Sequence, residues 1–230
     1  MFSQYLEILS ECPLFQGITK ENLTMLLDCL QPTVYNYEKD EYIALMGDPY
    51  LGLGIIVGGC ATISKESAAG NRVFLASLEP GELFGEMVAF SRQAEWPATV
   101  QAQQPCTVFY IAQTSITGQC DKTCTWHTVL VENMLRILSS KGLMLNRRVE
   151  YLLIKSMRAK LSAFFLEYVN KTGKLSFVLP MNRNQLAEFL NVSRSSMCRE
   201  MSRMRAEGVL DFHRSAIQIR DLKLLNTMVE

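Results

Sequence analysis

The spacing of hydrophobic residues changes along the chain, and each change predicts a different kind of structure. Residues 3–30 show the spacing of short amphipathic helices. From residue 32 to about 112, short β-rich runs such as TVYNY and CTVFYIA alternate with turn sequences such as GDPY and EPGE. Runs separated in this way are typical of an antiparallel barrel or sandwich. Helical spacing returns from about residue 124 to 150.

The part of the chain after residue 153 mixes helices with short strands. LIKSMRAKLSAFFLEYV predicts a helix that ends at NKTGK, and LSFVLP predicts a strand. Two more helices begin at Asn182, followed by two strand-like runs in VLDFHRSAIQIRD and a last helix from Asp221. The sequence therefore predicts an α+β chain, with a β-rich domain over 1–115, a hinge and long helix over 116–152, and a further domain over 153–230.

The long helix carries a heptad seam, because its apolar positions alternate between spacings of four and three residues. Such a seam lets two helices pack along their whole length, and we expect it to join two copies of the chain. The alternative is that the seam packs inside its own subunit. The seam positions are Val131, Leu135, Leu138, Gly142, Leu145 and Val149.

Residues 183–206 predict two helices joined by a tight turn. Asn191 suits the left-handed backbone that such a turn needs, and Ser193 is a good N-cap for the second helix. The second helix buries a stripe of methionines at positions 197, 201 and 204 and leaves arginines on the opposite face. This is the pattern of a helix-turn-helix; the alternative is an ordinary surface helix with solvated arginines.

The second helix of such a unit lies in the DNA major groove, where its N-terminal residues meet base edges. Arg199 can donate two hydrogen bonds to the O6 and N7 atoms of a guanine. The predicted base-reading residues are Arg194, Ser195, Cys198 and Arg199. The predicted phosphate contacts, which position the protein without reading sequence, are Arg183, Asn184, Ser193, Ser196 and His213.

Charge divides the chain in a way that fits this interpretation. The formal net charge is zero, but residues 1–146 carry 8 Lys+Arg and 15 Asp+Glu, whereas residues 147–230 carry 15 and 8. A basic C-terminal part is typical of nucleic-acid binding at one end of a protein, although a chance split between solvated surfaces would look the same. With no signal peptide and no apolar run of about 20 residues, we expect a cytoplasmic protein without a membrane segment and with reduced cysteines.

Three segments together resemble the CRP/FNR family of bacterial transcription regulators: PGELFGEMVAF, the long helix, and LAEFLNVSRSSMCREMSRMRAEGVLDF. The resemblance covers nearly the whole chain. It implies a cyclic-nucleotide-binding-like β-roll that senses a signal, a long dimerisation helix, and a winged helix-turn-helix. It also implies a homodimer that binds a palindromic site on double-stranded DNA, with RNA polymerase as a further partner.

The sequence departs from the members of the family whose effector is known. Gly85 and Glu86 match the residues that hold the ribose of cAMP, but Trp96-Pro97 stands where those members have an Arg-Ser pair for the phosphate. Without a guanidinium to pair with the phosphate, we do not expect cAMP binding. Cys12 and Cys29 are too far apart in sequence to match the N-terminal iron–sulfur cysteines of the FNR members.

Two places remain as candidate sensors. The first is an apolar pocket for a small organic effector, unless the same residues simply fill the core; its predicted residues are Phe84, Gly85, Glu86, Met87, Phe90, Trp96 and Pro97. The second is CDKTCTWH, where Cys120, Cys124 and His127 share one face if helical. Thiolates and imidazole suit zinc or haem iron, and Cys106 could complete the set. The interpretation that the sequence favours is nevertheless buried, inert thiols.

An enzyme is not expected, because apart from the cluster of Cys120, Cys124 and His127 the sequence contains no catalytic set of serine, histidine and aspartate or of cysteine and histidine. A distant alternative is a redox protein that carries a cofactor and uses its winged helix for protein contacts. The best-supported expectation is a dimeric, sequence-specific transcription regulator whose signal acts at the β-roll or the hinge.

Overall fold

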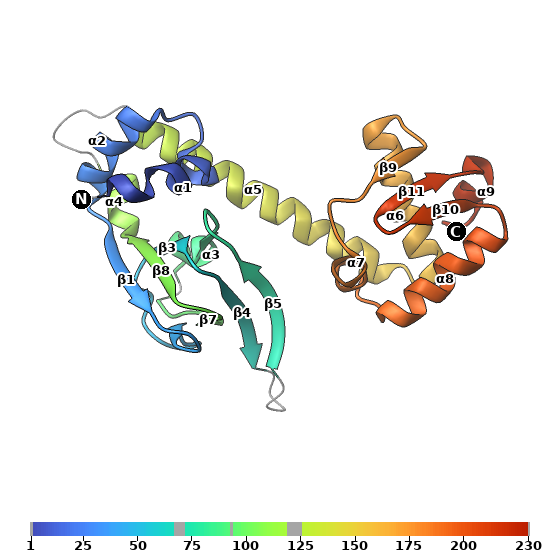
Figure 1. Cartoon of the computed structure of the whole chain (residues 1–230), viewed down its shortest axis with the longest axis horizontal. Coiled ribbons are helices and arrows are strands. Elements are labelled where there is room, and N and C mark those ends of the chain that lie inside the picture. Colours follow the sequence, from blue (N-terminus) through green and yellow to red (C-terminus); the bar gives the residue numbers. More distant parts are fainter. Residues whose placement is uncertain (1, 67–71, 93, 119–125, 230) are drawn as a thin grey trace. The chain divides into compact units, whose positions relative to one another are not determined.

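The computed structural model describes residues 2–66, 72–92, 94–118 and 126–229 (Figure 1). It divides into two compact units, Met1–Ser140 and Lys141–Glu230, and the boundary falls inside the long helix α5 (Trp126–Leu153). Each unit has its own hydrophobic core.

The first unit is built on two four-stranded antiparallel sheets. The order of the first sheet is β1 (Thr33–Tyr37), β8 (Cys106–Ile111), β3 (Leu53–Gly58) and β6 (Leu83–Phe84). The order of the second is β2 (Tyr42–Ala44), β7 (Thr99–Ala102), β4 (Ala61–Glu66) and β5 (Arg72–Leu78). Side chains from both sheets, among them Ile56, Phe84 and Val100, meet in a common buried cluster. This is the predicted antiparallel β-domain.

Helices cover the outer face of the first sheet. Leu53, Ile55 and Phe109 point away from the cluster between the sheets and pack against buried leucines of the N-terminal helices. These helices are η1 (Ser3–Tyr5), α1 (Leu6–Glu11), η2 (Pro13–Phe15), α2 (Lys20–Leu30) and α4 (Gln113–Thr117). The short helix α3 (Glu86–Ala89) follows β6. Thr19 caps α2, as its side chain accepts a hydrogen bond from the Asn22 backbone N–H.

The first turns of α5 belong to the same core, since Leu130 and Met134 are buried in it. Between them lies a buried polar residue. The Nδ2 atom of Asn133 donates to the backbone oxygens of Leu14 (3.0 Å) and Gln16 (2.8 Å). A buried amide costs free energy unless it is paired, and these two bonds satisfy its donors. They also hold α5 to the N-terminal segment.

The second unit is an α+β domain. Its three-stranded antiparallel sheet has the order β10 (Leu210–His213), β11 (Ala216–Ile219) and β9 (Ser176–Val178). Its helices are α6 (Met157–Thr172), α7 (Arg183–Phe189), α8 (Arg194–Ala206) and α9 (Leu222–Thr227). Leu161 and Phe165 of α6 and Met197 and Met201 of α8 share one core with Ile217 of the sheet.

The predicted elements occur in the expected order. The run TVYNY matches β1 residue for residue, the run CTVFYIA contains the whole of β8, and Asp221 caps α9. The α+β class is therefore confirmed. Within the described ranges, no helix is both long and apolar enough to cross a membrane.

Candidate nucleic-acid interface

The turn between α7 and α8 is tight and well anchored. Asn191 adopts the left-handed backbone (φ 51°), as its position in the sequence predicted. The next backbone N–H, of Val192, donates to the Ala187 oxygen at 2.9 Å. From α6, the buried Lys160 donates its Nζ to the Leu190 oxygen at 3.2 Å. A cation at a helix C-terminus satisfies a free carbonyl and opposes the helix dipole, so α6 helps fix the turn.

Helix α8 has one buried and one exposed side. Met197, Met201 and Met204 are fully buried, whereas Arg194 and Arg199 are exposed. Ser193 caps the helix, because its Oγ accepts the Ser196 backbone N–H at 3.2 Å. The predicted apolar stripe and N-cap are therefore both present, and the arginine charge lies on the side turned away from the core.

The four predicted base-reading residues occupy the first two turns of α8. Arg194, Ser195 and Arg199 are exposed, and the Nη2 atom of Arg199 donates to Ser196 Oγ at 3.2 Å. Cys198 differs from them, because it is half-buried and packs against the core of the second unit. The sequence pattern did not distinguish it from its exposed neighbours.

Among the predicted phosphate contacts, Asn184 and His213 are exposed at the start of α7 and the end of β10. Arg183 is placed differently. Its guanidinium donates to the Arg214 oxygen (2.9 Å) and the Met201 sulfur (3.0 Å), and lies 5.0 Å from the centre of the Phe212 ring. Burial lowers the pKa of Arg183. Its hydrogen bonds tie α7, α8 and the β10–β11 hairpin together.

The hairpin formed by β10 and β11 packs on α8 through Phe212. The guanidinium of Arg205 lies 3.9 Å from the Phe212 ring centre and pairs with Asp211 at 2.6 Å. The Phe212 backbone N–H, followed by Arg205, lowers the pKa of the Asp211 carboxyl. This hairpin is the wing of the winged helix-turn-helix.

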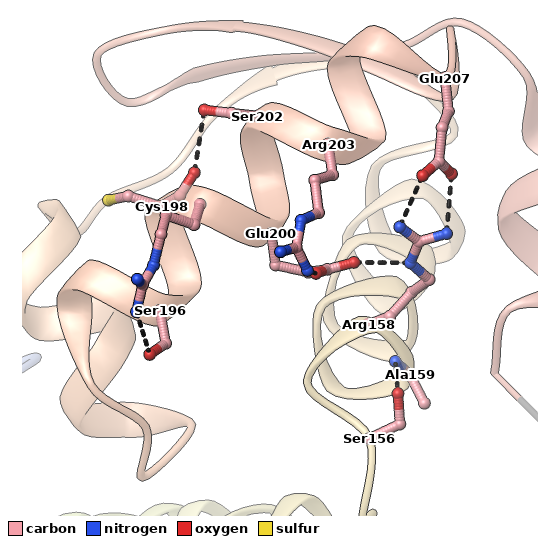
Figure 2. A network of polar contacts seen from close by, with 10 residues as sticks. Ser156, Arg158, Ala159, Ser196, Cys198, Glu200, Ser202, Arg203 and Glu207 are labelled. Atoms are coloured by element: carbon pink, nitrogen blue, oxygen red, sulfur yellow. Dashed lines mark hydrogen bonds and ion pairs between the residues drawn. The ribbon is translucent and has the colours of Figure 1, made fainter.

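A polar network connects α6 to α8 (Figure 2). Arg158, in the first turn of α6, donates its Nε to Glu200 Oε1 at 2.6 Å. Its two Nη atoms donate to the two oxygens of Glu207, both at 2.7 Å. Arg203 reaches the other oxygen of Glu200 at 3.2 Å. These contacts join residues 42 and 49 positions apart, and sequence periodicity alone did not reveal them.

In the first unit, Trp96 lies inside the cluster between the sheets and is 4 % exposed. Its ring packs against Tyr50 and Phe84, with ring centres 4.9 and 5.7 Å away. Gly85 has a left-handed backbone (φ +82°), and a Cβ there would meet the Trp96 ring at 2.8 Å. Trp96 therefore occupies space directly beside the Gly85-Glu86 pair.

The remaining predicted pocket residues differ in their exposure to solvent. Glu86 is buried, Pro97 is half-buried, and Met87 and Phe90 are 59 % and 40 % exposed. A separate cavity of about 290 Å³ lies against β2, β4, β5 and β7, lined partly by Tyr42, Ser64 and Arg72. Trp96 was expected either to line an effector pocket or to fill the core, and this arrangement favours a core position.

The thiol–imidazole candidates are only partly described. Cys120 and Cys124 lie outside the described residues. His127, in the first turn of α5, has its Nε2 atom 3.3 Å from the Cys29 sulfur and its Nδ1 atom 3.3 Å from the Ile116 oxygen. Cys106 is buried, and burial followed by the nearby Cys60 raises its pKa to about 11. In the part of the chain that the structure describes, no three His, Cys, Asp or Glu side chains form a metal site.

The seam of α5 changes character along the helix. Val131 and Leu138 are half-buried, and Leu138 packs on the core of the first unit. Leu135, Leu145 and Val149 are exposed by 58 %, 56 % and 47 %. Gly142 faces open space, because a Cβ added there would meet no atom of a neighbouring described element within 4 Å. A large apolar surface of α5 thus has no partner among the described residues of the single chain.

Two known domain families match the chain. The family described as "Cyclic nucleotide-binding domain" matches residues 34–123, and that described as "Crp-like helix-turn-helix domain" matches residues 159–228. The chain belongs to the CRP/FNR family. The expected architecture, a cyclic-nucleotide-binding-like β-roll followed by a helix-turn-helix, is that of this family and is confirmed.

Members of the CRP/FNR family match over nearly the full length. The Cyclic AMP receptor protein of Thermus thermophilus is 24 % identical over 221 residues, covering 93 % of this chain and 94 % of the relative. The CRP-like cAMP-activated global transcriptional regulator of Mycobacterium tuberculosis is 21 % identical over 227 residues, covering 95 % and 97 %.

Solved structures show the same fold. The Catabolite Activator Protein of Thermus thermophilus superposes with a TM-score of 0.55 at 20 % identity, covering 94 % of this chain and 98 % of that one. The structure of CprK complexed with OCPA gives a TM-score of 0.62 at 15 % identity, covering 88 % and 92 %.

Proposed function

We propose that this member of the CRP/FNR family is a sequence-specific regulator that binds double-stranded DNA through α8. The observation that carries the proposal is the two-sided α8, with methionines fully buried and Arg194 and Arg199 exposed behind a tight turn at Asn191. A helix held in this way presents its N-terminal side chains to the major groove. The basic balance of residues 147–230 supplies the attraction to phosphates.

In this proposal Arg199 reads a guanine through O6 and N7, and Arg194 and Ser195 contact neighbouring base edges. Cys198 contributes at most its sulfur edge, because it is half-buried. Asn184, Ser196 and His213 contact phosphates, together with the backbone around Ser193. The phosphate contact expected of Arg183 is not part of the proposal, since its guanidinium is engaged with the wing.

The proposed active form is a homodimer joined along α5. Leu145 and Val149 are apolar, exposed and part of the heptad seam, and pairing two copies would remove this apolar surface from water. Two copies of α8 then match a palindromic operator with half-sites about 10 base pairs apart. RNA polymerase would be the protein that such a regulator contacts at a promoter.

We propose that cAMP is not the signal. Trp96 is buried against Gly85 at the position where a phosphate-binding arginine is needed, and its ring fills space beside the ribose-binding pair. A small organic molecule bound in the β-roll is the first candidate signal in place of cAMP. The expected result is that millimolar cAMP leaves the thermal unfolding midpoint unchanged, whereas it raises that of the Thermus thermophilus relative. A rise in the midpoint of this protein would contradict the proposal.

A redox signal is the second candidate, because the Cys29 sulfur lies 3.3 Å from an imidazole nitrogen whose ring is oriented by the Ile116 carbonyl. A thiol beside a base is the arrangement that raises thiol reactivity. The check is DNA affinity before and after treatment with hydrogen peroxide, in the native chain and in Cys29→Ser. Equal loss of affinity in both proteins would exclude Cys29 as the sensor.

The central test is the binding of Arg199→Ala to an operator selected from random duplexes with the native protein. Losing a bidentate contact to guanine costs about 1–3 kcal/mol of discrimination. The variant should therefore lose operator affinity at least about tenfold while keeping its affinity for a shuffled duplex. Arg220→Ala, which removes an exposed arginine outside α8, is the control. Equal loss on both duplexes would contradict base reading by Arg199.

A further inference from the structure

The guanidinium of Arg158 uses its donors on two acidic residues of one helix. It binds Glu200 through Nε at 2.6 Å and Glu207 through both Nη atoms at 2.7 Å. Figure 2 shows the Arg158 side chain reaching up from α6 between the two carboxylates of α8. Since a guanidinium is planar and rigid, its hydrogen bonds fix direction as well as distance.

The two carboxylates lie at different heights on α8. Glu200 is in the middle of the helix and Glu207 is its C-cap, seven residues later and therefore about 10 Å further along the axis. One contact would hold the position of a helix but would leave its tilt free. Two contacts about two turns apart restrain both, and both are made by the first turn of α6.

Burial distinguishes this network from ordinary surface ion pairs. The Glu200 side chain is 12 % exposed and that of Arg158 is 30 % exposed, whereas Arg203 is 71 % exposed. Exposed pairs contribute little because water screens them. Removing Arg158 would leave the largely buried Glu200 with the exposed Arg203 as its ionic partner. It would also take from Glu207, which is 41 % exposed, its two-atom contact with Arg158, so the network depends on Arg158 more than on Arg203.

The network also affects the charge that α8 presents. The helix carries Arg194, Arg199, Arg203 and Arg205 together with the acidic Glu200 and Glu207. Glu200 lines the same open cleft, of about 360 Å³, as Ser196, Arg199 and Arg203. A free carboxylate there would repel a phosphate and compete for the arginines that face DNA. Arg158 pairs with both carboxylates and keeps that competition low.

We propose that Arg158 is a positioning residue for DNA reading: it sets the tilt of α8 against α6 and thereby decides whether Arg194 and Arg199 meet their bases. Arg158 itself is not assigned a DNA contact. The proposal rests on the function proposed above for α8. Under this proposal, sequence specificity depends on Arg158, which lies outside the helix-turn-helix. The two carboxylates that hold Arg158 would weaken DNA binding if their charges were left unpaired.

The experiment compares the native chain with Arg158→Gln, Arg158→Lys and the control Arg220→Gln. Binding is measured by fluorescence anisotropy on the selected operator and on a shuffled duplex of equal length, below the unfolding temperature of every variant. Arg158→Gln should lower operator affinity about tenfold or more and change shuffled-duplex affinity by less than about threefold. Arg158→Lys should fall between, because an ammonium keeps the charge but cannot form the bidentate contact.

A triple variant, Arg158→Gln with Glu200→Gln and Glu207→Gln, separates position from charge. It has no unpaired carboxylate, but it also lacks the ionic contacts that fix α8. Under the proposal its ratio of operator to shuffled affinity stays low. Recovery of the native ratio in the triple variant would overturn the positioning role and leave only charge neutralisation.

The remaining outcomes separate this inference from the function on which it rests. Equal affinity of the native protein for operator and shuffled duplex would overturn both. Discrimination by the native protein that persists in Arg158→Gln would overturn the inference alone. Loss of discrimination in Arg220→Gln as well would also overturn it, since any change of charge in the domain would then act in the same way.

Discussion

At the scale of single residues, Asn191 matters through its backbone conformation more than through its side chain. Its φ of 51° lies in the left-handed region, which glycine adopts most easily and, among the other residues, asparagine and aspartate most readily. Its backbone N–H donates to the Glu188 oxygen at 3.1 Å, which closes the end of α7. The geometry of the turn, and through it the start of α8, depends on this conformation.

Replacing Asn191 by glycine should therefore change the free energy of unfolding by less than about 1 kcal/mol. Replacement by valine should lower it by about 1–2 kcal/mol or more, because a β-branched residue is strained in this region. Urea unfolding of both variants measures the difference. Equal stability of the two would mean that the turn relaxes to another conformation.

Cys12 makes a pH-dependent contribution to stability. Its thiol is buried in the core of the first unit, and burial raises its pKa from 9.0 to about 11, despite a hydrogen bond from the backbone of Leu14 that opposes the shift. The folded state therefore favours the neutral thiol. This contribution is fully present below the ordinary thiol pKa and is lost as pH rises from 9.0 towards about 11.

The free energy of unfolding should accordingly fall between pH 9.0 and about 11. In Cys12→Ala it should start lower, because a buried side chain is truncated, but it should fall less steeply over this interval. The two slopes come from urea titrations at a series of pH values. Parallel curves would show that the Cys12 thiol ionises equally well in the folded and unfolded states.

Residue-scale prediction worked where the cause is local. Asn191, the Ser193 cap and the methionine stripe depend on neighbours within a few positions, so the sequence shows them directly. The Cys29–His127 contact joins residues 98 positions apart, and no local pattern indicates it. Trp96 shows the other limit, because an apolar residue beside a ligand and one in a core have the same sequence signature.

At the scale of elements, helix α5 keeps a large apolar surface exposed in the single chain. Leu145 and Val149 remain exposed after the chain has folded. A heptad seam predicted this helix and its apolar positions from sequence, because the spacing is local. Which surface covers the seam depends on a second molecule, and the sequence of one chain does not decide it.

Leu145→Lys should shift the protein from dimer towards monomer, since it places a charge in the middle of the apolar seam. Ser140→Lys is the matched control, because it adds the same charge to the same helix on the side opposite the seam. Light scattering after size exclusion gives the mass of each. A Leu145→Lys protein that stays dimeric at micromolar concentration would show that the seam is not the interface.

At the scale of the whole molecule, DNA reading and dimerisation should be coupled through the spacing of half-sites. A dimer contacts two half-sites at once, so the second contact is intramolecular and adds affinity without any new interaction. The native protein should bind the palindrome at least about a hundredfold more tightly than a duplex with one half-site.

Leu145→Lys should bind these two duplexes with nearly equal affinity, because each monomer reads one half-site. Anisotropy titrations on the two duplexes at one salt concentration test this. A variant that is monomeric in solution but still prefers the palindrome about a hundredfold would show that DNA itself assembles the dimer without the seam.

The two buried bonds of Asn133 limit how α5 can respond to any signal. An amide that donates to both the Leu14 and Gln16 oxygens opposes rotation and sliding of the helix at that turn, because either movement would break a hydrogen bond of a buried group. The direction in which the next turns of α5 face thus depends on the N-terminal segment that contains these two residues. A signal that leaves these bonds intact can act on α5 only further along, by bending the helix or by changing the residue at which it ends.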